Sequence, residues 1–405
     1  MAIRTVEGAA IVPGFRFAAA RAGLKKNGQP DVALAVADEA VAAAGVFTTN
    51  LVRAAPVDLA AERVALGRVR AILVNSGCAN ACTGAAGMEA SRETTSAVAK
   101  AIGADEREVL PASTGVIGVV LDKRKVIERV PSLVASLSEN ADPFAEAILT
   151  TDRGAKVVHA RGIIGGRPFV VLGVAKGAGM IHPNMAPLVP HATMLAFLFT
   201  DAVADGASLA ASIAGVADAT FNESSVDGDT STNDTLVVLA SGRAGTDAPS
   251  GRVAPELEEA MVLVCDELAK KMVADGEGAE HLVELHVSGL ASNDEARRIA
   301  RTVATSPLVK TAFYGQDPNW GRLLAAAGRA GVPFDPSRAR ILVGGIAIVE
   351  RGLGKGADAE AAAHDVMARP SYRVDLVLGE GPGRARYLTS DLGIGYVKCN
   401  ADYRS

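Results

Sequence analysis

Residues 193–199 read TMLAFLF, a short and almost wholly apolar run that predicts a strand buried on both faces. The segment in front of it, Lys176–Ala192, reads KGAGMIHPNMAPLVPHA and is rich in glycine and proline. Proline has no backbone N–H and a fixed φ angle, so this segment is expected to lack regular structure. Thr193 therefore opens a core strand directly after an irregular segment.

Two further stretches predict strands. Ala71–Val74 (AILV) is typical of a buried strand and is expected to end at the turn Asn75–Gly77. Val157–Gly173 predicts a hairpin, because Gly165-Gly166 lies between two apolar, β-branched stretches.

Helical patterns occur between these strands. Glu89–Ile102 is rich in helix formers and is followed by Gly103, a suitable C-terminal cap. Glu256–Val273 places five apolar side chains on one face at helical spacing. Ser292-Asn-Asp-Glu295 fits a capping box at the start of another helix. Because helices and strands alternate and hairpins occur among them, the sequence predicts a mixed α/β fold.

The composition excludes several classes of protein. The 405 residues are 49% hydrophobic and 21% charged, so the chain can bury a core and is not expected to be disordered. A net charge of −5 without a long basic run argues against nucleic-acid binding. We expect no membrane span, because no apolar run reaches about 18 residues, and no signal peptide in Met1–Phe15. Four cysteines in a long chain favour a reduced, cytoplasmic protein. Cys78 and Cys82 lack the further ligands that a metal site needs, so we expect no metal.

Thr193 offers a nucleophile that needs no histidine. The six histidines are scattered, and the G-x-S-x-G pattern of a serine hydrolase is missing. If the bond between Ala192 and Thr193 is cut, the new α-amino group, with a pKa of about 7.7–8.0, can act as the base for the threonine hydroxyl. From these residues alone, a threonine that begins an ordinary strand remains the alternative.

Motifs along the whole chain decide between these interpretations. Together, and in this order, they resemble the ornithine acetyltransferase (glutamate N-acetyltransferase) family. The motifs are PGF at 13–15, NSGCANACTG at 75–84, STGVIG at 113–118, TTD at 150–152, KGAGMIHPNMA at 176–186, TMLAF at 193–197, FN at 221–222, VDGDTSTND at 226–234, DGEGA at 275–279, FYGQDPNWGR at 313–322 and GYVKCNADYRS at 395–405.

The resemblance implies a fold, a processing event and a reaction. Members have a layered α/β/β/α sandwich with a C-terminal α/β subdomain, similar to self-processing aminopeptidases. The precursor cuts itself between Ala192 and Thr193, giving an α chain (1–192) and a β chain (193–405). Residues 193–280 would complete the main domain, and about 281–405 would form the subdomain. Thr193 would take acetyl from N2-acetyl-L-ornithine and pass it to L-glutamate in the cyclic arginine pathway.

The resemblance also assigns the site. Thr193 is the nucleophile, and Thr114 with Gly115 would form the oxyanion hole. No cofactor is expected, although acetyl-CoA is used as a substrate by some members. The expected partners are N-acetylornithine, glutamate and the chain's own halves in an α2β2 heterotetramer. The substrate-binding positions are Thr151, Lys176, Thr193, Glu277, Asn400 and Ser405.

Two segments leave alternatives open. The interval from Lys176 to Thr193 exceeds the family pattern by the six residues Pro187–Ala192, which lengthen the segment that must bend for Thr193 to attack its preceding carbonyl. An uncleaved binder of N-acetyl amino acids and a self-processing aminopeptidase or amidase therefore stay as alternatives. Asp227–Asp234 contains three acids, but an EF-hand calcium loop would need glutamate where Val238 stands, so turns that satisfy the local backbone are expected instead.

Overall fold

The computed structural model describes residues 3–183, 185 and 194–402, and these form two compact units. The first unit takes the chain up to Asn222 together with Asp229–Met272. The second takes Glu223–Gly228 and the chain from Val273 onward. The bond between Ala192 and Thr193 lies outside the described residues, so the division into two chains stays a prediction.

The first unit is built on a mixed sheet. Nine strands of the described chain take part, in the order β1-β6-β7-β8-β10-β3-β4-β5, with β2 beside β3. The pairs β8–β10 and β4–β5 are parallel, and the other pairs are antiparallel. The strands are β1 (Arg4–Glu7), β2 (Phe15–Ala20), β3 (Val32–Phe47), β4 (Arg68–Cys78), β5 (Val109–Val116), β6 (Lys156–Ile164), β7 (Arg167–Lys176), β8 (Leu195–Thr200) and β10 (Thr235–Ala240).

Strand β3 joins two layers of this sheet. Its first part pairs with β2, its last part pairs with β10, and its register with β4 shifts between Val36 and Val41. Side chains of β2 and β8 meet in the space between the layers. The Phe17 and Phe199 rings lie 5.0 Å apart, nearly perpendicular at 84°, a geometry that adds about 0.5–1.5 kcal/mol to their burial. The buried core of the unit therefore lies between two strand layers.

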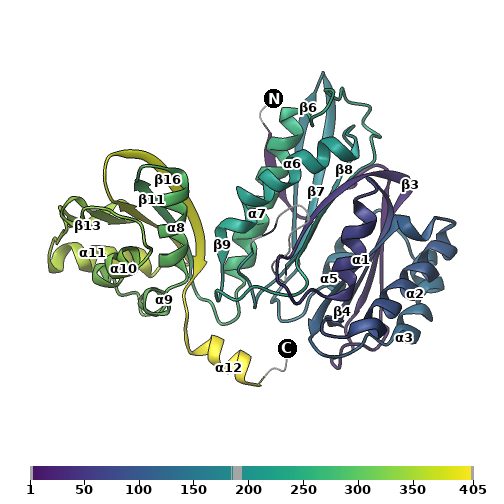
Figure 1. The fold of residues 1–405 in the computed structure, drawn as a ribbon, viewed down its shortest axis with the longest axis horizontal. Helices are drawn as coiled ribbons and strands as arrows, with labels where there is room; N and C mark the ends of the chain where they lie inside the picture. Colours follow the sequence, from purple (N-terminus) through teal and green to yellow (C-terminus); the bar gives the residue numbers. More distant parts are fainter. Residues whose placement is uncertain (1–2, 184, 186–193, 403–405) are drawn as a thin grey trace. The chain divides into compact units, whose positions relative to one another are not determined.

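Helices cover the outer faces of both layers (Figure 1). Alternate residues of β3 and β4, such as Leu34 and Leu73, pack in a separate core with α2, α3 and α4. On the other layer, Gly173 of β7 lies against Val264 and Leu268 of α7, where a larger side chain would not fit. The predicted layered, mixed α/β fold is confirmed. The helices are α1 (Ala55–Val64), α2 (Gly84–Ile102), α3 (Lys123–Ile127), α4 (Val130–Ala135), α5 (Asp142–Ala147), α6 (Gly206–Asp218) and α7 (Pro255–Ala274).

Most local predictions hold in this unit. Gly165 and Gly166 form the β6–β7 hairpin with φ angles of 57° and 83°, which glycine adopts without strain. Gly103 caps α2 in the left-handed region, at φ 68°. The predicted turn Asn75–Gly77 is wrong, because β4 continues through it to Cys78. Parallel pairing with β5 overrides the local turn preference of Asn-Ser-Gly there.

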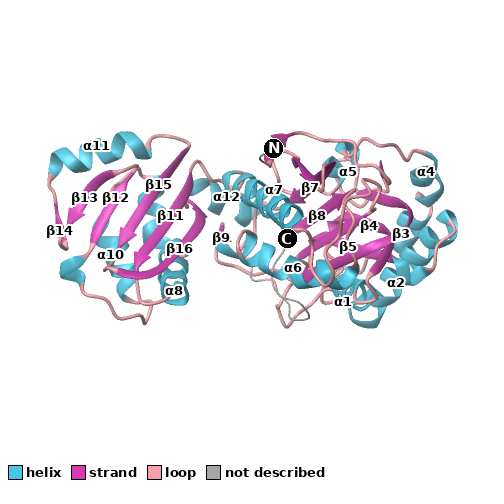
Figure 2. Cartoon of the chain, turned by 90° about the horizontal axis from the view of Figure 1, so that it is seen from above, coloured by secondary structure: helices cyan, strands magenta, loops and turns pink. Residues whose placement is uncertain are grey.

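The second unit is a seven-stranded sheet, counted over the described residues, with helices on one face. Val283, Leu285 and Val287 of β11 are buried in one core with α8, α9, α10 and α11, whereas Glu284 and His286 are partly exposed. Figure 2 shows these strands side by side. Their order is β14-β13-β12-β15-β11-β16-β9. The elements are β9 (Ser224–Ser225), β11 (Leu282–Gly289), β12 (Arg340–Val343), β13 (Ile346–Glu350), β14 (Leu353–Gly354), β15 (Ser371–Val377), β16 (Gly381–Ser390), α8 (Asn293–Ala304), α9 (Pro307–Tyr314), α10 (Trp320–Gly328), α11 (Ala357–Met367) and α12 (Ile394–Asp402).

The capping box at α8 is formed with one change of partner. The Ser292 hydroxyl accepts from the Glu295 N–H at 3.2 Å, as predicted. The Glu295 carboxylate, however, accepts from the N–H of Ala291 at 3.0 Å, one residue before the cap. The bond to the Glu295 N–H satisfies an amide that a helix start leaves unpaired, so the sequence predicted the helix start correctly.

Candidate active site

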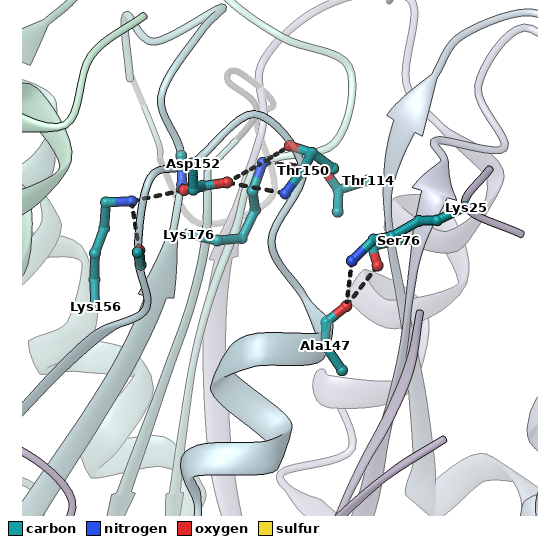
Figure 3. A network of polar contacts seen from close by, with 10 residues as sticks. Lys25, Ser76, Thr114, Ala147, Thr150, Asp152, Lys156 and Lys176 are labelled. Atoms are coloured by element: carbon teal, nitrogen blue, oxygen red, sulfur yellow. Dashed lines mark hydrogen bonds and ion pairs between the residues drawn. The ribbon is translucent and has the colours of Figure 1, made fainter. Parts of the chain in front are cut away.

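Lys176 brings two segments of the first unit together. It is the last residue of β7 and only 3% exposed. Its Nζ donates to the Thr150 hydroxyl at 2.8 Å and to the Thr114 hydroxyl at 3.2 Å (Figure 3). The structure thus joins Lys176 and Thr114, two of the predicted site residues. The contact from the TTD motif is made by Thr150, while the predicted Thr151 is the next residue and is half-buried.

Asp152 is a central residue of this network that the sequence interpretation did not single out. One carboxylate oxygen lies 2.7 Å from Lys156 Nζ and accepts from the Gly177 N–H at 2.6 Å. The other accepts from the Thr150 N–H at 3.0 Å and lies 3.6 Å from Lys176 Nζ. The carboxylate is fully buried. Burial alone would raise the pKa of Asp152, but the charges of Lys176 and Lys156 outweigh it and lower the pKa.

A second set of contacts fixes the chain that leads into the TTD motif. The carbonyl of Ala147, the last residue of α5, accepts from the Ser76 hydroxyl and from Lys25 Nζ, the latter at 3.2 Å. Lys25 also donates to the Pro30 carbonyl at 2.9 Å, and burial lowers its pKa to about 8. Figure 3 shows Ser76 and Ala147 beside the lysine network. The loop that carries Thr150 and Asp152 is therefore anchored to β4.

Gly115 allows the STGVIG segment to touch β4 closely. It has φ +127°, and a Cβ there would lie 2.4 Å from the Gly77 carbonyl carbon and 2.6 Å from Cys78 N. On the strand side, the Ser113 hydroxyl donates to Asn75 Oδ1 at 2.6 Å. Only glycine fits this conformation and this gap. The backbone at Gly115 is thus held at a fixed place beside Thr114.

We predict that Gly115→Ala lowers the turnover of acetyl transfer on the order of 10²-fold, because the methyl group forces the 77–78 or 114–115 backbone to move. Gly118→Ala is the matched control. Gly118 also has a positive φ, of +82°, but no heavy atom lies within 4 Å of its added Cβ. Steady-state kinetics of both variants measure the turnover of acetyl transfer. Equal turnover in the Gly115 variant and in the parent would show that the close approach has no catalytic role.

Asn233 ties the acidic 227–234 segment to the STGVIG segment. Its buried side-chain amide donates to the Ala79 carbonyl at 2.7 Å and to the Ser113 carbonyl at 2.8 Å. A local turn contact also exists, since the Asn233 N–H donates to the Ser231 hydroxyl at 3.3 Å. The prediction of purely local turns was therefore incomplete. Nothing local in the sequence signals contacts to residues more than a hundred positions away.

Asp234 is a buried carboxyl with no hydrogen-bond partner among the described residues. It is 0% exposed, and neither carboxylate oxygen is paired there. Burial raises the pKa of Asp234 well above its usual range, although the charge of Lys176 acts in the opposite direction. Its neighbour Thr235 donates from its N–H to the Met194 carbonyl at 2.9 Å. Asp234 therefore lies immediately before β10, the strand that pairs with β8.

A raised pKa gives Asp234 a defined effect on stability. The Asp234 carboxyl stabilises the folded protein fully below its pKa in the unfolded chain, about 3.9. As pH rises from there toward the pKa that it has in the folded protein, the free energy of unfolding falls by up to about 1.4 kcal/mol per pH unit. We predict that Asp234→Asn gains stability over the parent as pH rises from 4 to 7. Denaturant unfolding in a Thr193→Ala background measures this. A difference in stability between Asp234→Asn and the parent that does not change with pH would contradict the prediction.

Glu277 and Asn400 are brought together in the second unit. Asn400 Nδ2 of α12 donates to Glu277 Oε2 at 2.8 Å and to the Tyr396 carbonyl at 3.1 Å. These two predicted substrate-binding residues are thus neighbours, although 123 positions separate them in the chain. Ala192, Thr193 and Ser405 lie outside the described residues, so their predicted roles stay predictions.

The described residues contain neither a membrane-spanning helix nor a candidate metal cluster. Among the helices in the described part of the chain, none combines the length and the apolar character needed to cross a bilayer. Within the same ranges, no three His, Cys, Asp or Glu residues are grouped so that they could hold a metal ion.

Comparison with known proteins gives matches along nearly the whole chain. The ArgJ family matches residues 16–405. The arginine biosynthesis bifunctional protein ArgJ of Geobacter sulfurreducens is 49% identical, over 97% of this chain and 100% of the relative. The protein of the same name from Syntrophotalea carbinolica is 46% identical, over 97% and 99%. A crystal structure of ornithine acetyltransferase from Mycobacterium tuberculosis, complexed with ornithine, is 38% identical, covers 46% of this chain and 100% of its own, and has a TM-score of 0.43. This chain belongs to the ArgJ family.

Proposed function

We propose that the chain transfers the acetyl group of N2-acetyl-L-ornithine to L-glutamate in arginine biosynthesis. Relatives named arginine biosynthesis bifunctional protein ArgJ, 46–49% identical over almost their full length, support this proposal. The observation that carries it is the buried Lys176 network, in which residues of the STGVIG, TTD and KGAGM motifs meet. Three motifs that are far apart in the sequence thus form one polar centre.

The proposed reaction has two halves. The Thr193 hydroxyl oxygen attacks the acetyl carbonyl while its proton passes to the Thr193 α-amine. The C–N bond to ornithine breaks, the ornithine nitrogen takes up that proton, and an acetyl-Thr193 ester remains. The glutamate amine then attacks the ester and gives up a proton to the Thr193 α-amine, the ester C–O bond breaks, and this proton passes to the threonine oxygen. N-acetylglutamate leaves, and the enzyme is restored.

Two positions are proposed to stabilise the tetrahedral intermediates. Thr114 and Gly115 would donate to the oxyanion, which requires donors already held in place. The fixed backbone of Gly115 against Gly77 and Cys78 supports this role. No metal or organic cofactor is needed in this scheme, because the α-amine of Thr193 moves the proton.

Lys176 is proposed to bind the substrate α-carboxylate. Two of its three N–H donors reach Thr114 and Thr150, while Asp152 at 3.6 Å is an ion pair beyond hydrogen-bond distance. Among the described residues, one N–H therefore remains for a substrate carboxylate. Thr151, Glu277, Asn400 and Ser405 are the other positions proposed to bind substrate. Glu277 would contact either the amine end of the substrate or the transferred proton.

The reaction is tested by incubating the purified protein with N-acetylornithine, with and without glutamate. We expect ornithine and N-acetylglutamate in equal amounts, with the parallel double-reciprocal plots of a ping-pong mechanism. Release of acetate without N-acetylglutamate would instead identify the aminopeptidase or amidase alternative. Binding without turnover would identify the non-catalytic alternative.

A second activity is proposed because the relatives are named bifunctional. Acetyl-CoA would acetylate Thr193 in place of N-acetylornithine, and glutamate would again receive the acetyl group. Formation of free CoA thiol in the presence of glutamate tests this activity. We further propose that cleaved α and β chains assemble as an α2β2 heterotetramer in the cytoplasm. Light scattering of the purified protein tests the assembly.

A further inference from the structure

Glu277 and Asn400 are joined by the pairing of two strands. Strands β11 and β16 are antiparallel, and Leu282 at the start of β11 lies opposite Ser390 at the end of β16. The segment before β11, which carries Glu277, and the segment after β16, which leads into α12 and Asn400, therefore leave the sheet at the same end. Both segments lack regular structure over several residues next to the sheet. The pairing of β11 with β16 therefore does not by itself fix the side chains of Glu277 and Asn400.

Asp391 connects these two segments directly. It is the first residue after β16, and its carboxylate is fully buried. One oxygen accepts from the N–H groups of Glu280 and His281, at 2.9 and 3.2 Å. The other lies 3.1 Å from His281 Nδ1. A single carboxylate thus holds the chain three and four residues after Glu277. Hydrogen bonds to a charged group are about twice as strong as neutral ones.

Two glycines bring the same segments into close contact. Gly278 has φ +67°, and a Cβ there would lie 2.1 Å from Tyr396 N and 2.3 Å from the Gly395 carbonyl carbon. The segment after Glu277 therefore presses against the first turn of α12. The hydrogen bond from Asn400 Nδ2 to Glu277 Oε2, at 2.8 Å, forms beside this contact.

The main chain at Asp391 is also held by hydrogen bonds that do not involve its carboxylate. Lys310 of α9 is buried, and its Nζ donates to the Ser390 carbonyl, to the Ser390 hydroxyl at 3.2 Å and to the Thr389 hydroxyl at 3.0 Å. The Leu392 N–H donates to the Lys310 carbonyl at 3.1 Å. Loss of the Asp391 carboxylate would therefore leave the end of β16 anchored and release mainly the 277–281 segment.

We propose that Asp391 is a positioning residue for the Glu277–Asn400 pair, holding the Glu277 segment against α12 so that both side chains present one surface to the amino-acid part of the substrate. The effect on transfer rests on the proposed function. The effect on the order of the 277–281 segment does not. Two measurements on the full chain separate these consequences.

The first measurement is amide hydrogen exchange. In Asp391→Ala, exchange over 277–281 should rise, because two of these amides lose their acceptor, while exchange in β11 and β16 stays as in the parent. Asp391→Asn keeps one acceptor oxygen for the amides and should restore part of the protection. Asp358→Ala, at an exposed position of α11, is the matched control. Unchanged exchange over 277–281 in Asp391→Ala would overturn the proposal, whatever the activity of the protein.

The second measurement is a double-mutant cycle on acetyl transfer. Asp391→Ala should raise KM for N-acetylornithine by about 10-fold, with kcat within about 2-fold of the parent. In a Glu277→Ala background the same substitution should change KM by less than about 2-fold, because the side chain that it positions is gone. Equal effects in both backgrounds would overturn the proposal. Full transfer by Glu277→Ala would instead refute the substrate role of Glu277.

Discussion

Thr193→Ala is expected to leave one uncut chain of 41.4 kDa and to lower acetyl transfer by at least about 10³-fold. The hydroxyl would serve both reactions, because it attacks the preceding carbonyl during cleavage and the acetyl carbonyl during transfer. Thr193→Ser is the matched control, since it keeps a hydroxyl on the same backbone and should retain both activities at reduced rates. A denaturing gel and the transfer assay report the two outcomes.

The same variant separates the alternatives. If the parent is uncut and shows no acetyl transfer, and Thr193→Ala binds N-acetylornithine as the parent does, the chain is a binder of N-acetyl amino acids rather than a transferase. The six extra residues Pro187–Ala192 are the reason to test for this outcome. They lengthen the segment that must bend for Thr193 to attack the preceding carbonyl. A parent that is cut and a Thr193→Ala variant that is not would show that the longer segment permits the attack.

Asp152→Asn is expected to destabilise the folded protein by about 3–5 kcal/mol, the largest stability effect predicted for this chain. The substitution leaves Lys156 and Lys176 buried without their shared carboxylate, which contacts Lys156 at 2.7 Å. Replacing Lys156 by methionine in the same chain should restore part of the loss, because one of the two buried positive charges is then removed. Thermal and denaturant unfolding in a Thr193→Ala background give the values.

The pH dependence of this effect has a defined sign. The pKa of Asp152 is lowered in the folded state, so its contribution is present above the unfolded pKa of about 3.9 and is lost as pH falls toward the folded pKa. The difference between parent and Asp152→Asn should therefore shrink below about pH 4. Asp105→Asn removes an exposed partner of Arg107 and should change the unfolding midpoint little at any pH. Equal unfolding curves for the parent and Asp152→Asn would contradict the account.

Periodicity and capping predicted much of the fold. The spacing of Leu257, Met261, Cys265, Leu268 and Met272 predicted α7, and all five side chains are buried. The buried strand after Thr193 is present as β8. The predicted turn at Asn75–Gly77 is wrong because β4 pairs with β5 there, a long-range interaction that local residue preferences do not reveal.

The motifs of the candidate site could be predicted from the sequence, but the hydrogen-bond and ion-pair partners of their residues could not. Lys176 and Thr114 were assigned from family resemblance, and the structure joins them. Asp152, Asn233 and Asp391 were not assigned, because a single sequence does not show which acid or amide becomes buried between distant segments. Asp152 illustrates this limit. Lys156 lies four residues after it in the sequence, but Lys176 comes close to its carboxylate only in the folded chain.

The most direct test of the central claim is the intact mass of the purified protein, recorded with and without N-acetylornithine. We expect two chains, residues 1–192 and 193–405, and one acetyl group on the second chain when N-acetylornithine is present and glutamate is absent. A single uncut chain of 41.4 kDa that gains no acetyl group would contradict it.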